Sequence, residues 1–193
     1  MNYRCRSSFK LLEMDDQYNL FQPGQVVIDC GAAPGSWSQI AALKAGAQDE
    51  GVEHSSGMVI SIDRLPIYPI PGATTLGSCD FTKPETQEKI KKLLNGRQVD
   101  LILSDMAPNA TGIKSMDHEA IIALAYSVIR FALLVSRVGA SLVVKVWEGR
   151  ELINLQKELH RFYKVVRLVK PPASRSDSAE KFVLARDFVG IKR

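Results

Sequence analysis

The sequence predicts an α/β fold in which a seven-stranded, mostly parallel sheet carries helices on both faces and ends in an antiparallel hairpin. Strand-like runs alternate with helix-like runs along the chain, which is typical of parallel strands joined by crossover helices. The last two strand-like runs are joined by residues 170–180, which show no helical pattern, so we expect an antiparallel pair there. Because no Pro-, Gly- or Ser-rich linker divides the 193 residues, we expect a single domain over 1–193.

The elements follow from the periodicity of apolar residues. Short apolar runs predict strands at 26–30, 58–63, 74–79, 99–104, 140–147, 163–169 and 181–186. Helical spacing predicts helices over 36–45, 84–94, 117–135 and 151–161, with a further helical pattern close to the N-terminus. The polar stretch 48–57 is predicted to be a surface loop.

Composition excludes few classes of protein. The formal net charge of +4 permits a polyanionic partner without requiring one. The three cysteines have no short spacing, which argues against a disulfide framework and a zinc site, so we predict no metal. We expect no membrane span and see no secretory signal. We also expect a monomer.

The first predicted strand runs into a loop of small residues followed at once by a helix. Gly31, Ala33, Pro34, Gly35 and Ser36 let the backbone approach a ligand closely. The pattern differs from the Gly-x-Gly-x-x-Gly of dinucleotide enzymes, because Ala33 replaces the second glycine and Pro34 has no N–H for a pyrophosphate. We therefore expect a different ligand at this loop.

Acidic residues follow the next three predicted strands. Asp63 suits a ribose diol, Asp80 can accept from an adenine amino group, and Asp105 can face a cation. In doubly wound sheets the carboxyl ends of the strands meet at the ligand site. Adenosine, ribose and a sulfonium with an ammonium together describe S-adenosylmethionine, which we predict as the cofactor.

Five motifs in order resemble the FtsJ family of 2′-O-ribose RNA methyltransferases. They are Arg-x-Arg-Ser-x-Phe-Lys-Leu at 4–11, Asp-Cys-Gly-Ala-Ala-Pro-Gly-x-Trp-Ser-Gln at 29–39, Ser-Asp-Met-Ala-Pro-Asn at 104–109, Val-Val-Lys-Val-Trp at 143–147 and Ser-Arg-x-x-Ser-x-Glu at 174–180. The resemblance covers nearly the whole chain. It implies a Rossmann-like S-adenosylmethionine-dependent methyltransferase fold, and it adds Trp37 and Phe81 to the predicted cofactor-binding residues.

The resemblance also implies a catalytic set of Lys10, Asp105, Lys145 and Glu180. Our hypothesis is that Lys145 is the general base, brought toward the neutral amine by burial and by Lys10, with Asp105 holding it beside the donor. Lys10 and Glu180 are expected to position the hydroxyl and its flanking phosphate. Methylation of a base amino group or of cytosine C5 is disfavoured, since the loop after the fourth strand and the cysteine contexts do not fit.

Within the family, the chain is most similar to the mitochondrial branch, whose members methylate a uridine of large-subunit rRNA. This resemblance implies a mitochondrial location and large-subunit rRNA, or the pre-ribosomal large subunit, as partner. The basic residues that we expect near RNA phosphates are Arg4, Arg6, Lys10, Lys114, Arg150, Lys170, Arg175 and Lys181. An enzyme of the same type that acts on tRNA or mRNA caps, and a ribosome-assembly factor that binds RNA, remain alternatives.

Overall fold

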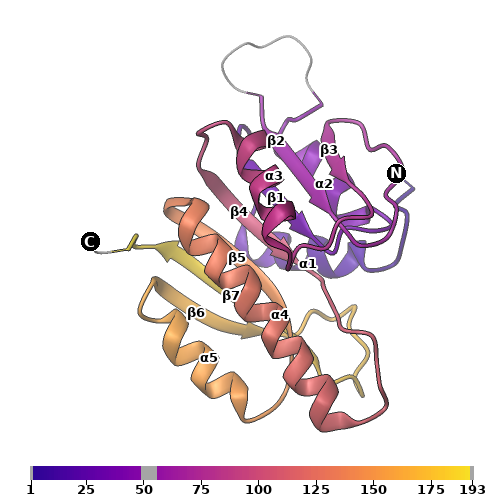
Figure 1. Ribbon diagram of the computed structural model, residues 1–193, viewed down its shortest axis with the longest axis vertical. Helices are drawn as coiled ribbons and strands as arrows, with labels where there is room; N and C mark the ends of the chain where they lie inside the picture. Colours follow the sequence, from indigo (N-terminus) through magenta and orange to yellow (C-terminus); the bar gives the residue numbers. More distant parts are fainter. Residues whose placement is uncertain (1, 49–55, 192–193) are drawn as a thin grey trace.

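The computed structural model describes residues 2–48 and 56–191, so most of the predicted loop at 48–57 lies outside the described residues. Seven strands form one sheet in the order β3-β2-β1-β4-β5-β7-β6 (Figure 1). The strands are β1 (Val26–Cys30), β2 (Met58–Ile62), β3 (Ala73–Leu76), β4 (Val99–Ser104), β5 (Ser136–Trp147), β6 (Tyr163–Val169) and β7 (Glu180–Phe188).

Strand pairing confirms the predicted mixed sheet. The pairs among β1 to β5 are all parallel, whereas β7 runs antiparallel to both β5 and β6. The C-terminal hairpin is therefore not simply added at the edge. Its second strand, β7, lies between β5 and β6 and brings Glu180 opposite Trp147 in the ladder.

Helices cover both faces of the sheet. One face carries α1 (Ser8–Tyr18) and α2 (Ser36–Lys44), and the other carries α3 (Pro84–Leu94), α4 (Lys114–Val135) and α5 (Glu151–Leu159). The alternation of side chains along β5 shows this division, because Leu142 and Val144 belong to the core beneath α3, α4 and α5, while Val143 belongs to the core beneath α1 and α2. Both faces of the central strands are thus buried, as expected for a parallel sheet.

Several element boundaries differ from the sequence-based prediction, and the starts of α4 and β5 differ by three residues or more. The α4 helix begins at Lys114 rather than at 117, and the Asp117 carboxylate accepts hydrogen bonds from the backbone and hydroxyl of Thr111 just before the helix. β5 begins at Ser136, directly after α4, because Ser136 pairs with Val99 of β4. Local apolar periodicity does not reveal either contact.

The α4 helix is also long and apolar enough, by length and composition alone, to cross a membrane, with a mean hydropathy of 1.7. No membrane span was expected from the sequence, and length and composition alone do not establish one. The helix packs on the sheet, and Ile121, Ala125 and Val128 are fully or almost fully buried in the core with β4 and β5. Such burial is typical of a core helix.

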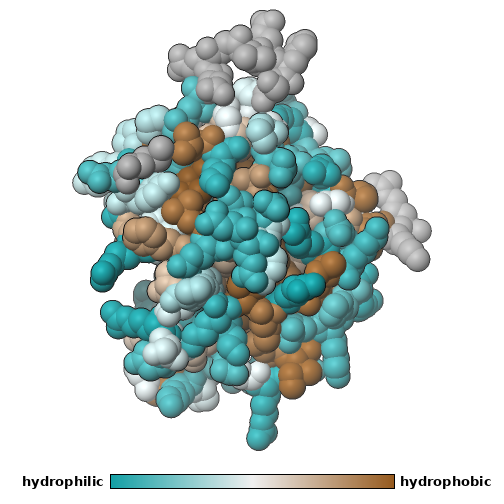
Figure 2. Space-filling model, turned by 180° about the vertical axis from the view of Figure 1, so that it is seen from behind, coloured by the Kyte–Doolittle hydropathy of each residue, from teal (hydrophilic) through white to brown (hydrophobic). Residues whose placement is uncertain are grey.

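The face opposite to that seen in Figure 1 is predominantly hydrophilic, and its apolar residues form small separate groups (Figure 2). Polar and charged side chains therefore provide most of the contact area that this face offers to a partner.

The chain reverses its direction of travel across the sheet between β1 and β4. β2 and β3 extend the sheet on one side of β1, and β4 starts the other side. At this switch point the two loops after β1 and β4 are in close contact. Gly31 has φ +75°, and a Cβ there would lie 2.7 Å from Met106 Cγ and 3.0 Å from the Met106 backbone nitrogen. Only glycine fits this position without displacing the neighbouring loop.

Candidate active site

A pocket of about 610 Å³ opens at the carboxyl ends of the strands on both sides of the switch point. Of the described residues, those that line it are Gly31, Ala33, Ile62, Asp63, Arg64, Leu65, Cys79, Asp80, Phe81, Thr82, Asp105, Met106, Ala107, Asn109 and Leu124. Six of the residues predicted to bind the cofactor belong to this lining: Gly31, Ala33, Asp63, Asp80, Phe81 and Asp105. The pocket therefore gathers the small-residue loop and all three strand-end carboxylates.

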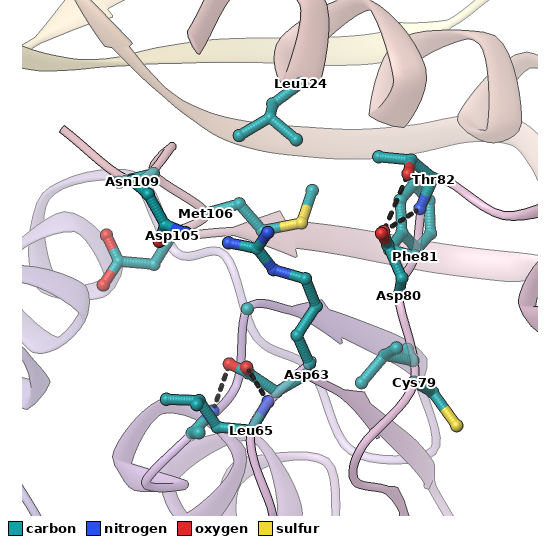
Figure 3. Close-up of a pocket in the computed structure, with 15 residues that line it drawn as sticks. Asp63, Leu65, Cys79, Asp80, Phe81, Thr82, Asp105, Met106, Asn109 and Leu124 are labelled. Carbon is teal, nitrogen blue, oxygen red and sulfur yellow. Dashed lines mark hydrogen bonds between the residues drawn. The ribbon is translucent and has the colours of Figure 1, made fainter. Parts of the chain in front are cut away.

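Two of the carboxylates are held by their own surroundings (Figure 3). Asp63 accepts hydrogen bonds from the backbone N–H groups of Ala33, at 2.9 Å, and Leu65, at 2.8 Å. Asp80 accepts from the hydroxyl and backbone N–H of Thr82, and the hydroxyl bond is the main cause that lowers the pKa of Asp80. Both side chains are thus hydrogen-bond acceptors in fixed positions, with Leu124 of α4 across the pocket.

The other predicted cofactor residues, Pro34, Gly35, Ser36 and Trp37, lie outside the lining of this pocket as the described residues define it. Trp37 is buried, donates from Nε1 to the Ser7 carbonyl at 2.9 Å, and has its ring centroid 5.6 Å from that of Phe182. Trp37 thus packs the start of α2 against Ser7 and Phe182, outside the pocket.

The four residues of the predicted catalytic set converge, although they come from four separate elements. Lys145 Nζ lies 2.8 Å from Asp105 Oδ1 and 2.9 Å from Glu180 Oε1. Lys10 Nζ donates to the other oxygen of Glu180, at 2.6 Å. The result is a continuous row in which Lys10, Glu180, Lys145 and Asp105 alternate in charge, and Asp105 also lines the pocket.

The charges within this row determine its ionisation. Burial lowers the pKa of Lys145, but the charges and hydrogen bonds of Asp105 and Glu180 outweigh burial and raise it above its ordinary value. Burial would raise the pKa of Glu180, yet the hydrogen bond from Lys10 and the charge of Lys145 bring it below its ordinary value. For Asp105, burial dominates and raises the pKa despite the opposing charge of Lys145.

These directions differ from the expectation that burial and Lys10 bring Lys145 toward the neutral amine. The positive charge of Lys10 is compensated by its own ion pair with Glu180, and two carboxylates flank Lys145. The resting site therefore holds Lys145 as an ammonium.

Several pocket residues were not predicted from the sequence. Met106, Ala107 and Asn109 come from the motif after β4, and Thr82 and Leu124 come from the start of α3 and from α4. The motif at 104–109 was a signal for the first three, since these residues follow Asp105 within the motif. Leu124 lies in the middle of an apolar helix and carries no local signal.

Asp29, in the middle of the buried face of β1, is fully buried beneath the start of α2. Ser38 Oγ donates to Asp29 Oδ2 at 2.6 Å and lies 2.6 Å from the Ser61 hydroxyl. Burial raises the pKa of Asp29 to about 7, partly opposed by the Ser38 hydrogen bond and assisted by the negative charges of Asp105 and Asp63. This carboxyl therefore changes its ionisation close to neutral pH.

We expect the free energy of unfolding to fall as the pH rises from about 4 to about 7, because the folded protein binds the Asp29 proton more tightly than the unfolded chain does. The contribution is fully present below the unfolded pKa of about 3.9, and its loss is on the order of 4 kcal/mol. Urea unfolding of wild type and Asp29→Asn at several pH values measures it. The difference between the two proteins should change across this window, and parallel profiles would contradict the assignment.

Among the described residues, 2–48 and 56–191, no group of three or more His, Cys, Asp or Glu side chains is arranged to hold a metal ion.

A doubly wound sheet with a pocket at its switch point, fixed strand-end carboxylates and a lysine between two acids is typical of a nucleoside-cofactor transferase. Residues 3–188 match the FtsJ-like methyltransferase family, and the chain belongs to that family. It is therefore a methyltransferase with the fold that the sequence predicted.

Individual relatives agree with this assignment. The chain is 50% identical over 190 residues to the mitochondrial rRNA methyltransferase 2 of Drosophila melanogaster, covering 98% of this chain and 76% of the relative. It is 44% identical over 188 residues to the ribosomal RNA large subunit methyltransferase E of Xanthobacter autotrophicus, covering 97% and 71%. A solved ribosomal RNA methyltransferase from Plasmodium falciparum has a TM-score of 0.84 and 26% identity, covering 98% of this chain and 100% of that one.

Proposed function

We propose that this protein transfers a methyl group from S-adenosylmethionine to the ribose 2′-hydroxyl of a uridine in large-subunit ribosomal RNA. The observation that carries the proposal is the position of Lys145 between Asp105 and Glu180, since Asp105 in turn lines the pocket. The names of the Drosophila and Xanthobacter relatives, both rRNA methyltransferases, favour this substrate over tRNA or an mRNA cap.

The pocket fits the proposed donor. Its volume suits a nucleoside-sized ligand. Gly31 lines the pocket at a point where a Cβ would clash with Met106, another lining residue. Asp63 and Asp80 are fixed acceptors suited to ribose hydroxyls and an adenine amino group. When bound, S-adenosylmethionine supplies an activated methyl group on a positively charged sulfur. Asp105 then provides negative charge on the same side of the pocket as Lys145.

The side chains of the row divide the remaining work. Lys145 first releases its own proton to solvent, since its amine must be neutral to act as a base, and it then accepts the proton of the 2′-hydroxyl. Asp105 and Glu180 fix its Nζ from two sides, at 2.8 and 2.9 Å. Lys10 holds Glu180 in turn, through the hydrogen bond to its other carboxylate oxygen. The general-base role of Lys145 is part of the proposal.

Four of the eight predicted phosphate contacts are already engaged within the protein. Arg4 and Lys170 donate to backbone carbonyls, and Lys10 and Lys181 form ion pairs with Glu180 and Glu148. The side chains of the other four, Arg6, Lys114, Arg150 and Arg175, make no hydrogen bond or ion pair with another described residue. Four phosphate contacts give weak, salt-dependent affinity for RNA.

We therefore expect methylation of a pre-ribosomal large subunit to exceed that of a short naked rRNA fragment by about tenfold or more in kcat/KM, because the particle supplies the missing contacts. Site-resolved 2′-O-methyl mapping on both substrates measures this. The expected product is one added 2′-O-methyluridine in large-subunit rRNA, and a Lys145→Arg protein is the control for contaminating activity. A product confined to tRNA or caps, or no methylation by a protein that binds the particle, would refute the proposed substrate.

The Drosophila relative is named as a mitochondrial protein. We include a mitochondrial location in the proposal on that basis.

A further inference from the structure

Arg4 makes three hydrogen bonds to backbone carbonyls, and together they join two loops. Its Nη1 donates to the Pro34 carbonyl and to the Tyr68 carbonyl, each at 2.9 Å, and its Nη2 donates to the Pro69 carbonyl at 2.7 Å. Pro34 belongs to the cofactor loop after β1, whereas Tyr68 and Pro69 belong to the connection between β2 and β3. One guanidinium thus fastens together two segments that are 34 residues apart in the chain.

Both of these segments form the donor pocket. The first carries Gly31 and Ala33, and the second begins at Asp63. On the pocket side the two segments are joined by the hydrogen bond from the Ala33 N–H to Asp63 Oδ2, at 2.9 Å. Arg4 makes the corresponding connection on the outer side. The position of the Asp63 carboxylate relative to the cofactor loop therefore depends on contacts from two directions.

The rest of the N-terminal segment is held against the same loop. The Arg4 backbone N–H donates to Gln39 Oε1 at 3.1 Å, and Cys5 Sγ lies 2.8 Å from Ser36 Oγ. At Gly35, which has φ +117°, a Cβ would lie 2.9 Å from Arg4 Nη1. The guanidinium is therefore packed directly on the glycine turn at the start of α2.

Arg6, only two residues away, has a different environment. Its side chain is exposed, and among the described residues it makes no hydrogen bond or ion pair, whereas Arg4 is half-buried. Two arginines that look equivalent in the sequence therefore differ in exposure and in their hydrogen-bond partners.

We propose that Arg4 is a positioning residue of the donor site, and that of this pair only Arg6 contacts RNA. The inference rests on the proposed function, because it assumes that the pocket binds S-adenosylmethionine. The guanidinium uses three of its five N–H donors, both of those on Nη1 and one on Nη2, to bind backbone carbonyls, which leaves fewer donors for a phosphate. The three bonds are solvent-accessible, so water can satisfy the carbonyls after its removal, but water cannot hold the two loops in place.

The test compares Arg4→Gln, Arg4→Lys and Arg6→Gln in the full chain. Calorimetric titration with S-adenosylhomocysteine, the stable product form of the donor, measures donor affinity. We expect Arg4→Gln to weaken binding by about tenfold or more, because the loops lose preorganisation. Lysine, which can reach fewer carbonyls, should restore part of the affinity. Arg6→Gln should bind as tightly as wild type.

RNA binding should show the opposite pattern. For Arg6→Gln, the slope of log affinity for rRNA against log salt should become shallower by about one, while for Arg4→Gln it should not change. Thermal melts establish that each variant is folded, and if Arg4→Gln does not fold, Arg4→Lys carries the comparison. Equal donor affinity in wild type and in the folded Arg4 variants overturns the inference, as does a changed salt slope in Arg4→Gln. Absence of donor binding in wild type would instead refute the proposed function.

Discussion

Replacing Lys145 by arginine is expected to reduce the rate of methyl transfer by about 10³-fold, the typical contribution of a general base, while donor affinity is unchanged. Arginine keeps a positive charge between Asp105 and Glu180, so the ion pairs survive. Its guanidinium does not lose a proton in proteins and so cannot accept the one from the ribose hydroxyl. Single-turnover methylation with saturating donor, together with calorimetry of donor binding, measures both quantities.

The matched control is Lys181→Arg. Lys181 is adjacent to Glu180 on β7 and pairs with Glu148 rather than with the catalytic row, so its replacement should have little effect on the methyl-transfer step.

Since the flanking carboxylates raise the pKa of Lys145, the wild-type rate should also increase by about tenfold per pH unit through neutral pH, as the neutral amine becomes more populated. An active Lys145→Arg protein with a flat pH profile would show that the ammonium form acts instead, by orienting the hydroxyl.

The second large effect is expected at Gly31. Gly31→Ala should weaken donor binding by about thirtyfold, which corresponds to about 2 kcal/mol. The added Cβ would meet the Met106 side chain at 2.7 Å and its backbone nitrogen at 3.0 Å. Met106 lines the donor pocket, so any movement that relieves the clash changes the pocket itself. Titration with S-adenosylhomocysteine measures the loss.

Gly96→Ala separates this steric effect from backbone strain. Gly96 has φ +83°, close to the +75° of Gly31, but a Cβ there would have nothing within 4 Å. Its replacement should cost only the left-handed backbone strain, about 1 kcal/mol of unfolding free energy, and should leave donor affinity unchanged. If both alanine variants bound the donor like wild type, the contact between Gly31 and Met106 would not be part of the donor site.

The regular part of the fold could be predicted from the sequence because its signals are local. The run Val26–Cys30 is apolar enough to be buried on both faces, and the helical spacing that follows indicates the crossover. The strand-end positions of Asp63, Asp80 and Asp105 also follow from local pattern, since parallel strands end at one edge of the sheet. The family motifs named the catalytic set in the same way, from short stretches of chain.

Other features depend on distances between elements that no local pattern encodes. The insertion of β7 between β5 and β6 brings Glu180 to 2.9 Å from Lys145. Burial would lower the pKa of Lys145, but the charges of Asp105 and then of Glu180 raise it. The different environments of Arg4 and Arg6 likewise depend on where the β2–β3 connection passes.

The sequence by itself thus determined the order of the elements, the class of fold and the residue types at the site, because apolar periodicity and short motifs are properties of neighbouring residues. Only the tertiary structure decided which charged side chains form ion pairs, which arginine binds backbone carbonyls and which glycine lies too close to a neighbouring loop to carry a side chain. The strength of a hydrogen bond or an ion pair decreases within a few ångströms, so the partners are known only once distant segments lie side by side.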